Sequence, residues 1–191
     1  MPKEEWTTIA GETTTILDLY ITYIVILAAI EPVASIIGMS IVGIRLPFVG
    51  SLQVPIATAV ASAFVHYILT LVGVYILALI IDALAPTFSG ERNISQAFKV
   101  ATYIYTPIWI IGVIAIIPTL SILGILGLYG LYLLYLGLPI LMKSPQEKSS
   151  VYIIVVIIAA IVIFVMISYI PRVVILYSHY STPSMPIHRI R

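Results

Sequence analysis

The sequence predicts an all-α protein, an integral membrane bundle of five transmembrane helices in one domain. Of its 191 residues, 61% are hydrophobic and only 9% are charged, whereas about a quarter of the residues in a soluble domain are charged. Five stretches each contain the roughly 20 apolar residues that a helix needs to cross the hydrocarbon core of a bilayer. The connections between them are shorter than the roughly 40 residues that an independent domain needs. Any activity is therefore expected in the membrane or at its surface.

The first two spans are predicted over residues 16–43 and 54–84. Residues 1–15 precede them and are expected to form a short cytoplasmic N-terminal segment. The hydroxyl of Thr15 can accept a hydrogen bond from the amide of Asp18, which is the pattern of a helix N-terminus. The short connection between the two spans predicts an antiparallel helical hairpin.

The third and fourth spans are predicted over residues 98–118 and 120–142. Asn93 precedes the third span, and Gln96 follows three residues later, which again suits a helix start. The fourth span carries three glycines at intervals of three residues, namely Gly124, Gly127 and Gly130. This spacing permits the close approach of another helix and leaves a homo-oligomer open.

The fifth span is predicted over residues 151–170, after Ser144 and Pro145, which suit the start of a helix. Pro171 is expected to end or kink this helix, because proline lacks the amide donor that a helix interior requires. The remaining residues, 171–191, are interpreted as a C-terminal tail.

Lysines and arginines set the expected orientation, because cytoplasmic loops carry an excess of them. The N-terminal side of the bundle carries Lys3, Arg92, Lys99, Lys143 and Lys148, and the other side carries Arg45 and Arg172 close to the spans. We therefore expect a cytoplasmic N-terminus and an external C-terminus. Asp18 and Asp82 fall near the same inner surface, so pairing with its basic residues is expected.

Two ionisable residues interrupt the apolar spans, Glu31 in the first and His66 in the second. At 1.5 Å per residue, each lies about 18 Å from the connection between the spans, which places both near the bilayer midplane. An unpaired charge at this depth costs roughly 2.5–3.5 kcal/mol, so we expect the two side chains to approach each other. Pro32 removes the amide that would bond to the Ala28 carbonyl and is expected to kink the span.

Two interpretations of this intramembrane polar pair stay open. The first, which we favour, is a structural contact that holds the helical hairpin together. The second is a protonation or ion site, because ionisable groups inside a membrane commonly mark transport paths.

The composition argues against several other functions. The chain has no cysteine, which removes disulfides, thiol catalysis and iron–sulfur clusters. Glu31 and His66 alone are too few ligands for zinc. A net charge of +1 does not supply the basic patch that nucleic acid requires, and the sequence contains no HExxH, G-x-S-x-G or Walker A motif. We expect no enzymatic activity, no cofactor and no metal.

Three groups of residues form a recognisable pattern. The first span begins with Asp18, Leu19 and Tyr20, and the third contains Tyr103, Tyr105 and Pro107. The fourth span and the loop after it contain Tyr129, Tyr132, Gly137, Pro139, Lys143, Pro145, Glu147 and Lys148. In this combination, the chain resembles the Yip domain, a family of small five-span membrane proteins named for interaction with Rab GTPases. Ile21 and Thr22 depart from the Gly-Pro that completes the family's first signature.

The resemblance implies a membrane protein without known enzymatic chemistry. Eukaryotic relatives act in vesicle traffic and membrane shaping, with partners on a long cytoplasmic N-terminal region. Only residues 1–15 precede the first span here, and this, with the isoleucine-rich spans and the absence of cysteine, indicates a prokaryotic member in a cell membrane.

We therefore predict a protein that contacts the lipid bilayer and organises membranes or scaffolds a peripheral or integral protein partner. Residues 85–97 and 143–149 would form its cytoplasmic face. The alternative is a small transporter, or an ion- or proton-conducting protein, that uses Glu31 and His66.

Overall fold

The computed structural model describes the backbone of residues 2–46 and 50–181, and it confirms the all-α fold class. Five helices in this part of the chain are long and apolar enough to cross a membrane. They cover Ile16–Val42, Ile56–Phe88, Ile94–Ile116, Ile122–Leu141 and Gln146–Val173. Each predicted span therefore corresponds to one helix, because a long apolar run is the strongest signal that such a sequence carries.

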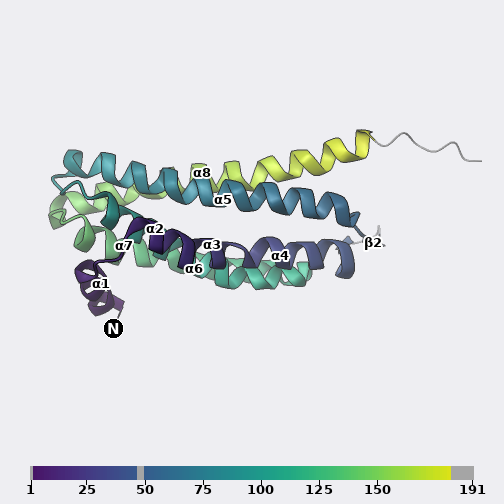
Figure 1. The fold of residues 1–191 in the computed structure, drawn as a ribbon, viewed down its shortest axis with the longest axis horizontal. Helices are drawn as coiled ribbons and strands as arrows, with labels where there is room; N and C mark the ends of the chain where they lie inside the picture. The colour runs from purple at the N-terminus through teal and green to yellow at the C-terminus, as the bar shows by residue number, and fades with distance from the viewer. Residues whose placement is uncertain (1, 47–49, 182–191) are drawn as a thin grey trace, which may run out of the picture.

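The spans form two layers along the long axis of the molecule (Figure 1). Helices α5 (Ile56–Leu84) and α8 (Gln146–Ser181) lie side by side in one layer. The other layer contains the first span together with α6 (Ile94–Ile111) and α7 (Tyr129–Leu141). The first span therefore packs between sequence-distant helices and can be supported from both layers.

The two ends of the bundle differ in structure. One end, which we call the N-terminal face, contains α1 (Pro2–Gly11), η3 (Ala85–Phe88) and the turn between α7 and α8, and α1 packs against α7 there (Figure 1). At the opposite end, the hairpin face, β1 (Ile44–Leu46) and β2 (Gly50–Leu52) pair in antiparallel fashion. This small hairpin connects the first span to α5, and its strands were not predicted from the sequence.

The first span is an irregular helix. It consists of α2 (Ile16–Leu19), the π-helical η1 (Tyr20–Ile24), α3 (Val25–Ala28), α4 (Ile30–Ile37) and the π-helical η2 (Gly38–Val42). Ala29 separates α3 from α4, and its amide bonds to the Ile26 carbonyl at 3.3 Å. Pro32 lies one turn further on and cannot donate a hydrogen bond to Ala28. The irregularity therefore falls directly before Glu31.

The third and fourth spans meet near the hairpin face through 3₁₀ helices. Helix α6 continues into η4 (Gly112–Ile116), the chain turns at Ile117, and η5 (Pro118–Leu128) leads into α7. The predicted start of the third span is present, because the side chain of Asn93 accepts a hydrogen bond from the Gln96 amide at 3.2 Å.

The fifth span differs from its prediction at Pro171. Helix α8 continues through this residue to Ser181, so the expected end of the helix there is wrong. A proline removes only one intrahelical hydrogen bond, and the turns on both sides of it keep theirs. Residues 171–181 of the predicted C-terminal tail are therefore helical, while residues 182–191 lie outside the described part of the chain.

Side-chain packing is densest in the half of the bundle next to the N-terminal face. The largest fully buried side chains there include Phe98, Leu134, Leu138, Met142 and Tyr152. Toward the hairpin face, the buried residues of the first two spans are small, as at Ala34, Ala59, Ser62 and Ala63. Small side chains fill less space between helices, so this half of the bundle is where cavities are expected.

The glycines of the fourth span test this packing. Replacing Gly130 with alanine should lower the free energy of unfolding by about 1–3 kcal/mol, because its new Cβ would overlap the backbone carbonyl of Ile104. Replacing Gly124 is the matched control, since a Cβ there has no neighbour within 4 Å. Thermal unfolding of both variants in detergent measures the difference, and equal stabilities would contradict the packing described here.

Candidate functional site

Glu31 and His66 lie together in the middle of the membrane-spanning part. Nε2 of His66, on α5, is 2.6 Å from Oε2 of Glu31, on α4. Their side chains are 24% and 32% exposed, respectively, so each is partly buried between helices. The structure thus brings the intramembrane polar pair into direct contact.

The short distance constrains the proton of the pair. A hydrogen atom must lie between Oε2 of Glu31 and Nε2 of His66, and either the imidazole nitrogen or a carboxylic acid can carry it. An imidazolium with a carboxylate and an imidazole with a carboxylic acid both carry zero net charge. Either state avoids the cost of an isolated charge at this depth. The pair can therefore hold one proton inside the membrane.

Two tyrosines connect the same pair of helices. The hydroxyl of Tyr67 donates to the Val25 carbonyl at 2.9 Å, and that of Tyr20 donates to the Leu71 carbonyl at 2.6 Å. The Val25 carbonyl can accept this bond because the first span is irregular here, and the Ala29 amide bonds to the Ile26 carbonyl instead. These bonds fix the register of the first span against α5 and so place Glu31 opposite His66.

The third span supports Glu31 from behind. A Cβ added to Gly112 would overlap the Cβ of Glu31, so only glycine allows the two backbones to approach this closely. One turn earlier, Trp109 stacks on Tyr105 with ring centroids 5.9 Å apart. Tyr105, Trp109 and Gly112 share one face of α6 and η4, which faces the polar pair.

A cavity of about 280 Å³ adjoins the pair. Its polar lining residues are Glu31, His66, Thr70, Tyr105, Trp109 and Ser168. The hydroxyl of Tyr105 and Nε1 of Trp109 are buried and make no hydrogen bond within the described part of the chain. Tyr105 was expected only as a motif residue and Trp109 was not predicted, because nothing in a linear sequence shows which face of the third span meets Glu31.

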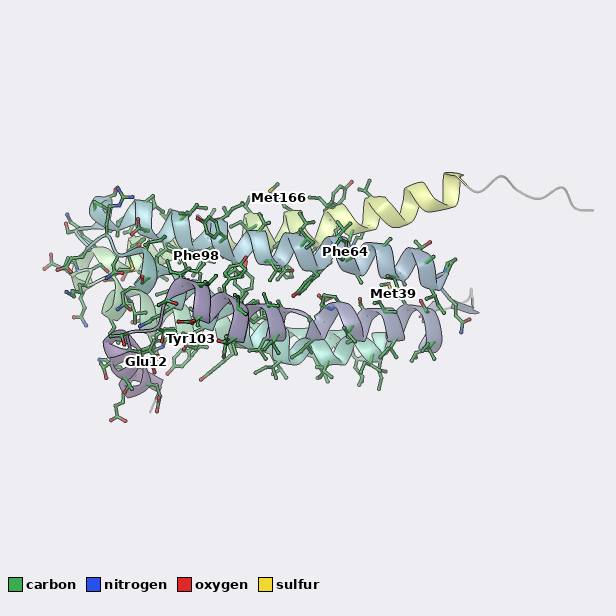
Figure 2. The ribbon with its side chains drawn as sticks, in the orientation of Figure 1. Glu12, Met39, Phe64, Phe98, Tyr103 and Met166 are labelled. Carbon is green, nitrogen blue, oxygen red and sulfur yellow. The ribbon has the colours of Figure 1, made fainter. Side chains whose placement is uncertain are left out.

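Helix α1 forms an unpredicted contact at the N-terminal face. Trp6 is only 2% exposed and lies against Gly137, where an added Cβ would come within 2.6 Å of its ring. Its ring meets that of Tyr103 edge to face at 5.8 Å, and Tyr103 lies beside α1 in Figure 2. A lone tryptophan in the polar N-terminal segment was the signal that could have indicated this contact.

Lys99 holds the end of α1 in place. Its side chain is 2% exposed, and Nζ donates to the carbonyls of Ile9 and Glu12, each at 2.7 Å. Lys99 was expected to pair with an acidic side chain, and the structure gives it backbone carbonyls instead. A cation suits this position because the last carbonyls of a helix lack intrahelical partners.

Among the other charges, Asp18 accepts a hydrogen bond from the Thr15 hydroxyl at 2.5 Å.

Three further basic residues of the N-terminal face have polar partners, two of them in ion pairs. Nη2 of Arg92 is 3.1 Å from Oδ2 of Asp82, and Nζ of Lys143 is 2.7 Å from Oε2 of Glu91. Nζ of Lys148 donates to the Ser89 hydroxyl at 2.9 Å. The contacts of Lys143 and Lys148 join the connection between α5 and α6 to the turn between α7 and α8.

The other motif residues occupy different environments. Tyr103, Pro107 and Tyr129 line an apolar groove of about 860 Å³ beside α1. Tyr129 and Tyr132 are exposed, with ring centroids 5.6 Å apart. Pro139 lies inside α7, while Pro145 and Glu147 are exposed at the start of α8. The motif residues therefore do not converge on one site, and the described residues include no group of three or more metal-ligating His, Asp or Glu side chains.

The polar pair can be tested by a double-mutant cycle of Glu31→Leu and His66→Leu. Each single variant leaves one ionisable group unpaired, so the double variant should be less destabilised than the sum of the single effects, with a coupling of about 1–3 kcal/mol. Unfolding in mixed micelles measures each free energy. Val33→Leu and Phe64→Leu, at exposed positions on the same helices, form the control cycle, and additive effects at the polar pair would refute the contact.

The attachment of α1 can be tested with Lys99→Met in a Trp109→Phe background, where Trp6 is the only tryptophan. Loss of two charge-assisted hydrogen bonds should weaken the docking of α1 by about 2 kcal/mol or more and shift Trp6 emission to the red. Lys148→Met serves as the control for losing a lysine at the same face. Unchanged emission, together with unchanged protease cleavage of α1, would show that Lys99 does not hold the helix.

Comparison with known proteins identifies the family. The model of the Yip1 domain matches residues 1–168, a range that includes α1, Glu31, His66 and both faces of the bundle. No curated protein and no solved structure is significantly similar to the chain. The family match covers most of the chain and agrees with its five apolar helices. The chain is therefore an integral membrane protein that belongs to the Yip1 domain family.

Proposed function

We propose that this protein is a non-enzymatic membrane scaffold, which organises the membrane or binds a protein partner through its N-terminal face. Membership of the Yip1 domain family supports a role of this kind. The proposed role rests on binding rather than on catalysis. We further infer that the N-terminal face is cytoplasmic and that the protein is prokaryotic, from the lysine and arginine distribution and the composition.

The observation that carries the proposal is the ordered structure of this face. The Glu91 amide donates to the Met142 carbonyl at 2.8 Å, and the Lys143–Glu91 and Lys148–Ser89 contacts lie beside this bond. Ser89 and Lys143 both adopt positive φ values, which the surrounding contacts hold in place. A surface that is already ordered loses less conformational entropy on binding a partner.

The proposal predicts that charge on this surface controls partner binding. A photocrosslinking amino acid at position 147 should capture a discrete protein in native membranes, and Lys143→Glu with Lys148→Glu should abolish that product while leaving the thermal stability nearly unchanged. Lys3→Glu on α1 is the matched control. The proposal fails if the product persists in the double variant or if crosslinking yields lipid alone.

A second candidate function is proton or ion conduction through the Glu31–His66 pair. The cavity that reaches both side chains favours it. Reconstituted protein would then show pH-dependent flux across liposomes, and Glu31→Gln would abolish the flux in folded protein. If the parent protein shows no flux and Glu31→Gln lowers only the folding yield, the pair is a structural contact instead.

A further inference from the structure

The cavity beside Glu31 and His66 continues into a second, apolar cavity of about 230 Å³. The two cavities share the lining residues Tyr105, Ile108, Gly124, Gly127 and Phe164. Together they reach the lower part of the range of about 300–1,000 Å³ that small-molecule sites occupy. One end of this combined site is polar and the other is apolar, so it is amphipathic as a whole.

The apolar end faces the bilayer. Ile161 and Phe164 of α8 and Leu128 of η5 line it, and each of these side chains is at least half exposed. Gly124, Gly127 and Gly130 line the opposite wall, and a Cβ added at Gly124 would meet no atom within 4 Å, so the wall is open at Gly124. A hydrocarbon chain could therefore enter laterally from the lipid and lie along this groove.

The polar end offers hydrogen-bond donors that the protein does not use. The Tyr105 hydroxyl and Trp109 Nε1 lack partners among the described residues, although these side chains are only 5% and 2% exposed. Buried polar groups are normally paired, and an indole can only donate. The missing partner at Trp109 must therefore be a hydrogen-bond acceptor.

The position of this end in the membrane limits the ligand further. It lies beside Glu31 and His66 near the midplane, where a phosphate or ammonium headgroup would have to leave water entirely. An oxygen of a hydroxyl or carbonyl group can accept a hydrogen bond there without carrying charge. The polar end therefore suits a small, uncharged oxygen headgroup and excludes phospholipids.

We propose that this site binds a single-chain lipid that ends in an uncharged oxygen group, with the oxygen at Tyr105 and Trp109 and the chain in the groove lined by Gly124 and Phe164. The site does not depend on a protein partner at the N-terminal face. It accounts for the two unpaired donors and for the opening toward lipid with one ligand.

The test uses Trp109 as its own reporter. In a Trp6→Phe background, Trp109 is the only tryptophan, and protein in lipid nanodiscs is titrated with 2-bromododecan-1-ol, whose bromine quenches nearby indoles. Saturable quenching is expected with the alcohol, whereas 2-bromododecane should quench only weakly and linearly because it lacks the oxygen. If both probes quench alike, water or unspecific lipid fills the site and the proposal is wrong.

Two substitutions separate the polar end from the groove. Tyr105→Phe removes a hydroxyl that has no partner among the described residues, so the thermal stability should stay unchanged. The affinity for the alcohol should fall by about tenfold, which is the equivalent of one hydrogen bond. Tyr135→Phe, at an exposed position on α7, is the matched control. An added Cβ at Gly124 meets no protein atom, so the side chain of Gly124→Leu can extend into the groove and should block it. An affinity of Tyr105→Phe equal to that of the Tyr135→Phe control would overturn the proposal.

A second measurement covers the case in which Trp6→Phe fails to fold. The unaltered protein is photolabelled with a diazirine-bearing dodecanol, and the labelled peptides are identified by mass spectrometry. Labels are expected within residues 104–131 and 160–168, and excess dodecanol should displace them while dodecane should not. Labels spread evenly over all lipid-facing helices would contradict a defined site.

Discussion

The absence of water in the hydrocarbon core is the constraint on which the rest of this structure depends. Polar groups there must find partners within the protein, because lipid chains offer none. Glu31 and His66 meet this requirement with each other, and Tyr20 and Tyr67 meet it by donating to backbone carbonyls across the same two helices. These contacts fix the first span against α5, and the third span then packs closely behind Glu31 through Gly112.

Side-chain size divides the bundle into two structural regions. Large side chains fill the half next to the N-terminal face, where paired charges and backbone hydrogen bonds order the connecting loops. Small residues and glycines line the other half and leave cavities beside the polar pair. The bundle therefore combines ordered connecting loops at one end with cavities between helices at the other.

The sequence predicted the parts of this structure that depend on local composition. Long apolar runs located all five spans, and equal distances from one connection placed Glu31 and His66 at the same depth. The docking of Trp6 against Gly137 could not be predicted, because residues 131 positions apart in the chain contact each other only through tertiary packing. The carbonyl partners of Lys99 were missed for the same reason. The helix does not end at Pro171, because the low helix propensity of one proline is outweighed by the continuous helix on both sides of it.

The length of α8 has a consequence for how the protein sits in its membrane. Its 36 residues span about 54 Å as a straight helix, well beyond the roughly 30 Å thickness of the hydrocarbon core. Tilting can absorb part of this mismatch, but a tilt large enough to absorb all of it lies outside the usual range. Part of α8 must therefore lie outside the hydrocarbon core, so this single helix reaches from the lipid chains into the headgroup region or the water beyond it.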